Sequence, residues 1–189
     1  ATVSKLNYQE EIDFLVGHPE RNKYICNLVK GLTGNTLVLF QLIEKHGNIL
    51  HSILEEIIDS SRKIFFVYGG TDADTREKVR ELIEKEKDAI ICASYGVYST
   101  GINIRNLHNI VFASPSKSRI RNLQSIGRGL RKSETKESAT LYDISDDLSY
   151  NGKKNYTLNH FIERVKIYTS EYFPYRIYTI PIQTITDLL

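Results

Sequence analysis

The chain has 189 residues, of which 41% are hydrophobic and 25% are charged, a composition typical of a folded globular protein. A net charge of +2 excludes a generally polycationic nucleic-acid binder, so any such role needs a local basic patch. No apolar run approaches the ~20 residues of a membrane span and no signal peptide opens the chain, so we expect a cytoplasmic protein. The chain begins with Ala1 and contains no methionine, which predicts a piece of a longer polypeptide.

The predicted elements begin with helical patterning over residues 7–31, interrupted at "GHPE". Five apolar, β-rich runs follow, at residues 36–43, 63–70, 89–94, 109–114 and 138–145. Amphipathic spacing predicts helices between them at residues 48–61, 75–88 and 119–133. The strands are continuously apolar rather than alternating, as expected when helices cover both faces of a parallel sheet. The sequence therefore predicts a doubly wound α/β domain with a mostly parallel sheet.

The two ends of the chain lie outside this alternation of strands and helices. We therefore divide the chain into a helical lead-in (1–31), an α/β domain (32–150) and a C-terminal extension (151–189). The extension holds a helix with a core-facing stripe, followed by a β-like run over residues 175–182. Its cationic and aromatic side chains either extend a nucleic-acid path or form the solvated side of a packed helix. They are Lys153, Lys154, Tyr156, Arg164, Lys166 and Tyr168.

The two cysteines, Cys26 and Cys92, both lie in apolar runs and have no metal-ligand spacing. Buried, reduced thiols are therefore expected, and no metal site is predicted.

Small and hydroxyl-bearing residues gather where the predicted strands end. Gln41, Gly70, Thr71, Ser94 and Ser116 all follow or close a strand. Ligands of open parallel sheets bind outside the carboxyl ends of the strands, where backbone amides and hydroxyls can hold phosphate oxygens. The alternative is ordinary turn chemistry, because turns between strands and helices commonly use the same residue types.

The run "QSIGRGLR" places Gln124, Arg128 and Arg131 on one helical stripe, since successive residues turn by roughly 100°. Arginine forks suit phosphate oxygens, and Gly127 and Gly129 would let a ligand or a neighbouring backbone approach closely. A basic, solvated helix face explains the same pattern. No G-x-x-x-x-G-K-[ST] phosphate cradle and no D-E-x-[DH] sequence occurs in the chain, so these arginines cannot hydrolyse ATP unaided.

Four segments resemble motifs of the superfamily 2 helicases, in the family's order, across residues 36–131. "QSIGRGLR" resembles motif VI, Q-x-x-G-R-x-x-R, and "ICASYGVYSTGINIRNLHNIVFASPSKS" resembles motif V with the strand after it. "TLVLF" resembles motif IV, and "YGGTDADTRE" resembles the element that follows motif IV, with Tyr68 in place of the usual histidine.

The resemblance implies a second RecA-like domain, whose missing N-terminal partner domain would hold most of the ATP and Mg²⁺. It implies that Arg131 is the arginine finger and that Arg128 also faces the nucleotide. Gln124, Gly101 and Asn103 would contact the nucleotide, although the family commonly has aspartate at the position of Asn103. The resemblance implies contacts to the nucleic-acid backbone for Ser94, Gly70 and Arg76. We assign the same contact to residues at the strand ends or in the turns that follow them, namely Gln41, Thr71, Ser116 and Lys117.

The function implied by the resemblance is that of a motor domain of an ATP-dependent DNA helicase or translocase. Its partners would be single-stranded or branched DNA, or RNA–DNA hybrids, in recombination, replication and repair, and no membrane. The residues alone leave two alternatives: a non-catalytic nucleic-acid-binding module with a basic helix, and a Rossmann-type enzyme domain. The second lacks support, because no G-x-G-x-x-G follows any predicted strand.

Overall fold

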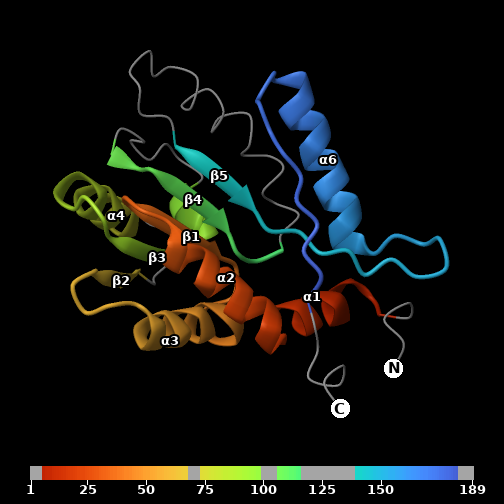
Figure 1. Ribbon diagram of the computed structural model, residues 1–189, viewed down its shortest axis with the longest axis horizontal. Helices are drawn as coiled ribbons and strands as arrows, with labels where there is room; N and C mark the ends of the chain where they lie inside the picture. The colour runs from red at the N-terminus through yellow and green to blue at the C-terminus, as the bar shows by residue number, and fades with distance from the viewer. Residues whose placement is uncertain (1–5, 68–72, 99–105, 116–138, 183–189) are drawn as a thin grey trace.

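The computed structural model describes residues 6–67, 73–98, 106–115 and 139–182. These residues form one five-stranded sheet flanked by helices (Figure 1). The strands lie within the five predicted runs and are β1 (Thr36–Phe40), β2 (Ile64–Val67), β3 (Ile90–Ser94), β4 (Asn109–Phe112) and β5 (Thr140–Asp143). Their order is β2-β3-β1-β4-β5, and every neighbouring pair is parallel. The predicted parallel, doubly wound α/β fold is confirmed.

Helices cover both faces of this sheet because successive strand residues point to opposite sides. Val38 and Phe40 of β1 belong to a core cluster with α2 (Pro19–Gly31) and α3 (Asn48–Ile57). Leu37 and Leu39 belong to the other cluster, which includes α4 (Ala73–Lys85) and α6 (Tyr156–Ser170). Figure 1 shows α2 and α3 along the lower side of the sheet and α6 on the upper side. Burial of both strand faces explains why the strands read as continuous apolar runs.

The first helix, α1 (Tyr8–Gly17), is joined to the last helix by a buried carboxylate. Glu11 is only 2% exposed and accepts hydrogen bonds from the first turn of α6. The donors are the Asn155 side chain, the backbone amides of Tyr156 and Thr157, and the Thr157 hydroxyl, at 2.7–3.0 Å. The carboxylate thus satisfies helix N–H groups that lack a partner within α6. The division of the chain into three segments stays a prediction.

The chain after β1 differs from the prediction. The strand was expected to continue to residue 43, but it ends at Phe40 and is followed by a short π-helix, η2 (Ile43–Gly47). The turn carries His46 into the interior, where it is fully buried. The apolar Leu42 and Ile43 prolong the strand pattern, but a polar interaction described below decides the conformation.

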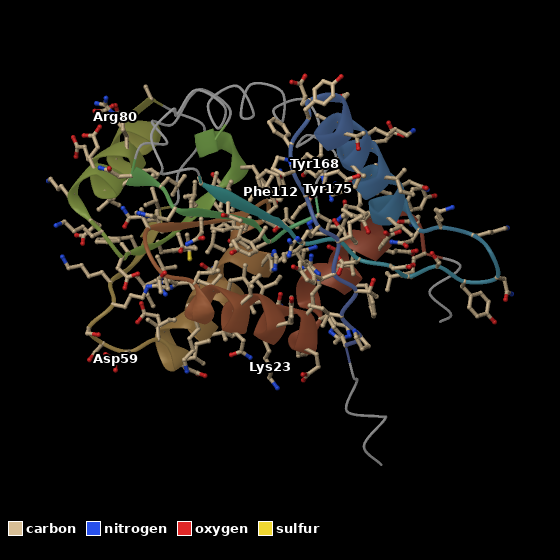
Figure 2. All side chains as sticks on the ribbon, turned by 45° about the horizontal axis from the view of Figure 1, so that its top comes forward. Lys23, Asp59, Arg80, Phe112, Tyr168 and Tyr175 are labelled. Atoms are coloured by element: carbon tan, nitrogen blue, oxygen red, sulfur yellow. The ribbon has the colours of Figure 1, made fainter. Side chains whose placement is uncertain are left out.

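The C-terminal run over residues 175–182 was predicted to be β-like, and this prediction is wrong: it forms no strand. Its side chains are all exposed, and Pro181 cannot donate a backbone hydrogen bond to a sheet. High β-propensity without a neighbouring strand edge does not produce a strand. Figure 2 shows Tyr175 beside Tyr168 on the inner side of α6, near Phe112 of the sheet, and the two tyrosine rings lie 6.1 Å apart.

Both cysteines are buried free thiols, as predicted. Burial raises the pKa of the Cys26 thiol to about 12, so it stays protonated and unreactive at neutral pH.

Candidate nucleotide and nucleic-acid site

The carboxyl ends of the strands lie together along one edge of the sheet. In the parallel register, Phe40 of β1 pairs with Ser94 of β3, and Phe112 of β4 pairs with Asp143 of β5. The residues that follow these positions therefore emerge side by side. This is the edge where open α/β sheets bind their ligands.

Two predicted site residues are fully described, and both lie at this edge. Gln41 follows β1 and is exposed, and Ser94 closes β3 and is half-buried just before the short helix η3 (Tyr95–Tyr98). Arg76 lies in the first turns of α4, and its side chain is outside the described part of the structure. The other predicted site residues also lie outside the described residues, namely Gly70, Thr71, Gly101, Asn103, Ser116, Lys117, Gln124, Arg128 and Arg131.

A buried polar chain lies directly beneath this edge. The backbone amide of Gln41 donates to Ser114 Oγ at 3.0 Å, and Ser114 Oγ lies 2.5 Å from His46 Nδ1. His46 Nε2 lies 3.0 Å from Asn22 Oδ1, and the Asn22 amide group donates to the carbonyl of Val16. Because Asn22 Oδ1 can only accept, His46 Nε2 carries the proton and Nδ1 accepts from the Ser114 hydroxyl. Every hydrogen bond in the chain then has one donor and one acceptor.

The imidazole of His46 is held in its neutral form. Burial, with a smaller contribution from the charge of Arg21, lowers the pKa of His46 to about 3. A histidine with this pKa and no solvent exposure cannot exchange protons with a substrate at neutral pH. The ring therefore has a structural role, joining Ser114 to Asn22, and takes no part in acid–base chemistry.

This pKa predicts how stability depends on pH. Unfolded histidine titrates near pH ~6.5, so between pH 6.5 and 3 the unfolded chain binds a proton that the folded chain does not. We expect His46 to cost roughly 3 kcal/mol of folding free energy as the pH falls from 6.5 to 4. Urea unfolding at pH 7, 5.5 and 4 should show a smaller acid-side loss for His46→Gln than for the unaltered chain. Equal losses in the two proteins would contradict the assignment.

Glu11 also causes a loss of stability at low pH, and this loss is the same in the unaltered chain and in His46→Gln. Burial alone would raise the pKa of Glu11, but hydrogen bonds from Asn155 and Thr157 outweigh it and lower that pKa. Protonation of Glu11 at low pH therefore also destabilises the fold, which makes the difference between the two proteins the informative quantity.

The carbonyl groups at the end of β4 are held by two further side chains. Arg21 Nη1 donates to the carbonyl of Ala113 at 2.9 Å, and the same guanidinium pairs with Asp146 through Nε at 2.7 Å and Nη2 at 3.0 Å. The Tyr95 hydroxyl donates to the carbonyl of Ser114 at 2.7 Å. The chain between β4 and Ser116 is thus fixed from α2, η3 and the loop after β5.

A second buried ion pair fixes α6 to the end of β5. Arg164 is 1% exposed and binds Asp143 through Nε at 2.7 Å and Nη2 at 2.9 Å, while the Tyr168 hydroxyl donates to the same carboxylate at 2.6 Å. Burial alone would lower the pKa of Arg164, but the charge of Asp143 raises it. Arg164 and Tyr168 therefore do not lie on a solvent-exposed nucleic-acid path, which the sequence had left open. Lys153, Lys154, Tyr156 and Lys166 are exposed.

Sequence reasoning missed the side chains that fix this edge: Arg21, Asn22, His46, Ser114, Asp143 and Asp146. A single histidine or arginine among polar neighbours is typical of a surface residue, so nothing in the local sequence indicates that it is buried. The exception is Ser114, which the sequence places at the end of the run over residues 109–114, where small and hydroxyl-bearing residues could hold phosphate oxygens.

The described residues contain no group of three potential metal-ligating side chains close enough to hold an ion, and no helix among them is long and apolar enough to cross a membrane.

A match to the family of helicase conserved C-terminal domains spans residues 20–133, which is more than half of the chain and includes all four motif-like segments. The chain belongs to this family, and the resemblance identified from the sequence is confirmed.

Among its relatives is the ATP-dependent DNA helicase uvsW of Enterobacteria phage T4, 40% identical over 186 residues, which covers 92% of this chain and 36% of the relative. The crystal structure of T4 UvsW matches with a TM-score of 0.69 and 39% identity, over 88% of this chain and 36% of that chain. The C-terminal part of the Fun30 ATPase domain, with 17% identity and a TM-score of 0.52 over 88% of this chain and 58% of that chain, shares the fold. The chain thus spans about 36% of the length of its T4 relative.

Proposed function

We propose that this chain is the second motor domain of an ATP-dependent DNA helicase or translocase. The observation that carries the proposal is the ordered set of four helicase-like motifs in the sequence, together with a parallel sheet whose carboxyl edge bears Gln41 and Ser94. The family match and the relationship to a T4 DNA helicase support it. The catalytic groups assigned to this chain are Arg131 as the finger on the γ-phosphate and Arg128 beside it.

In this mechanism, a first RecA-like domain of the same polypeptide binds ATP and Mg²⁺. ATP draws the two domains together because Arg128 and Arg131 gain phosphate partners only in the closed state, and a ligand drives motion only through such a difference. Gln124, Gly101 and Asn103 line the nucleotide from this side. Hydrolysis removes the γ-phosphate contact, and the domains separate.

The same closure moves nucleic acid. Residues at the ends of the β-strands contact the sugar–phosphate backbone of one nucleic-acid strand. These contacts do not depend on sequence, since sugar and phosphate groups carry no base information. We assign this role to Gln41, Gly70, Thr71, Arg76, Ser94, Ser116 and Lys117. Repeated opening and closing then moves the strand relative to the protein. We further propose branched DNA or RNA–DNA hybrids as substrates, in recombination, replication and repair. The proposed location is the cytoplasm, which is that of the host if a phage encodes the protein.

The test compares ATP hydrolysis by three proteins: the isolated chain, the first domain alone, and the polypeptide that contains both. We expect the isolated chain to hydrolyse no ATP and to bind nucleotide weakly, and the joined polypeptide to show DNA-stimulated hydrolysis. Hydrolysis by the first domain that is unchanged by joining this chain would contradict the proposal. That result would favour a nucleic-acid-binding module with a basic helix.

A comparison of forked, junction and RNA–DNA hybrid substrates tests the finer assignment. Stronger stimulation by branched or hybrid molecules than by plain single strands is expected. Equal stimulation by all of them would restrict the proposal to translocation on single strands.

A further inference from the structure

The end of β1 leaves one backbone donor that the sheet cannot use. Phe40 is the last residue of β1 to pair with β3, so the amide of Gln41 lies beyond the ladder. The amide instead donates to the hydroxyl of Ser114 at 3.0 Å. Ser114 lies in the chain that follows β4, the neighbouring strand of β1. A single side chain therefore links two strand ends that both lead into segments proposed to grip nucleic acid.

The Ser114 hydroxyl has a fixed direction because it donates a hydrogen bond to Nδ1 of His46. With Nε2–H committed to Asn22 Oδ1, only the lone pair of Nδ1 faces Ser114, so the hydroxyl donates to His46 and offers its own lone pair to Gln41. His46 and Ser114 are both 0% exposed, so water does not compete for either hydrogen bond. The Gln41 amide is thus held by an oriented chain that extends back to α2.

The π-helix is the device that brings His46 to this position. Its five residues follow Leu42 and return the chain beneath the end of β1. Gly47 closes the turn, and a Cβ atom at Gly47 would lie 2.7 Å from the ring of Phe40. Only glycine allows this close approach to the last residue of β1. Single π-turns of this kind are frequent at functional sites.

We infer that His46 and Ser114 are positioning residues for nucleic-acid binding, which set the main chain at Gln41 for contact with one sugar–phosphate backbone. The inference rests on the proposed function, because it assumes that this edge grips nucleic acid. Neither side chain touches the ligand. A direct contact with nucleic acid is excluded because both side chains are fully buried and both ring nitrogens of His46 are engaged, with Ser114 and Asn22.

The test measures the affinity of the full-length protein for labelled single-stranded oligodeoxythymidine by fluorescence anisotropy, together with DNA-stimulated ATP hydrolysis. Ser114→Ala and His46→Ala should each raise the Kd for DNA about tenfold. Each substitution removes roughly one hydrogen bond that holds the Gln41 main chain in its binding position. ATP hydrolysis at saturating DNA should change less than about twofold, since the proposed arginine fingers are untouched. His46→Gln, which offers both an acceptor and a donor, should recover most of the affinity.

Asn109→Ala is the matched control. Asn109 lies on the same strand as the segment leading to Ser114 but at its opposite end, where its buried side chain donates to the Thr33 carbonyl and to Thr36 Oγ1. We expect it to lower the unfolding temperature as much as Ser114→Ala while leaving the Kd for DNA unchanged. Equal Kd values for all variants, or an equal rise for Asn109→Ala, would overturn the inference.

The two readouts separate this inference from the proposed function. A full-length protein that binds DNA but shows no DNA-stimulated hydrolysis contradicts the motor, whereas the Kd series still decides the role of His46 and Ser114. Normal DNA-stimulated hydrolysis with unchanged Kd values contradicts the positioning role alone. A change confined to kcat would also overturn it, because the two residues would then act on the catalytic step rather than on binding.

Discussion

Arg131→Ala in the full-length protein should abolish DNA-stimulated ATP hydrolysis while leaving nucleic-acid binding nearly intact. An arginine finger contributes ~10³ to 10⁵ in rate in related phosphoryl transfer, because its charge meets the charge that develops on the γ-phosphate. Arg131→Lys should restore only a small part of the rate, since lysine lacks the planar fork. Steady-state hydrolysis at saturating DNA and a separate DNA-binding titration measure the two properties.

Arg176→Ala is the control for this experiment. Arg176 is an exposed arginine on the C-terminal run, away from the proposed motif VI helix in sequence, so its loss removes the same charge without touching the finger. Its hydrolysis rate should match that of the unaltered protein. A normal rate in Arg131→Ala would contradict the assignment of Arg131 as the catalytic arginine.

Arg164→Met should destabilise the fold by ~3–5 kcal/mol, because it leaves the largely buried Asp143 carboxylate without its cationic partner. The hydroxyls of Tyr168 and Ser145 would still donate to Asp143, but neutral hydrogen bonds do not compensate for a buried charge. The measurement is urea unfolding of the chain, in which the midpoint should fall at unchanged slope. The double variant Asp143→Leu with Arg164→Met should recover much of the loss, since it removes both charges.

Lys166→Ala provides the matched control on the same helix. Lys166 forms an exposed ion pair with Glu163, and such pairs contribute only ~0–1 kcal/mol. If Arg164→Met cost as little as Lys166→Ala and instead weakened DNA binding, Arg164 would be a nucleic-acid contact and the structural role assigned to it would be wrong.

The strands and most helices could be predicted because their sequence patterns report burial directly. Runs such as Leu37–Leu39 and Ile90–Cys92 are apolar on both faces, which only a sheet covered on both sides produces. The helices α3 and α4 show their apolar stripes at helical spacing.

Errors arose where long-range contacts decide the conformation. The run over residues 175–182 has strong β-propensity, yet it finds no strand to pair with and stays exposed. Arg164 lies among residues whose pattern indicates a solvated face, and its burial is favourable because the distant Asp143 and Ser145 accept its hydrogen bonds. The η2 turn was missed for the same reason, because His46 is fixed by Asn22 and Ser114, far away in the sequence.

For the candidate site, strand-end position and helical spacing located most of the named residues, and motif resemblance supplied their individual roles. Gln41 and Ser94 lie at the predicted edge, and the roles of all the site residues stay predictions. The buried groups that fix that edge carry no motif, and their pairing becomes visible only once β1 and β4 are side by side.

The central claim is tested most directly by a structure of the full-length protein with single-stranded DNA and ADP–aluminium fluoride, which mimics the phosphoryl group in transit. We predict a closed form in which the guanidinium of Arg131 lies within about 3 Å of a fluoride, a hydrogen-bond distance. An Arg131 side chain turned away from the nucleotide in that closed form would contradict it.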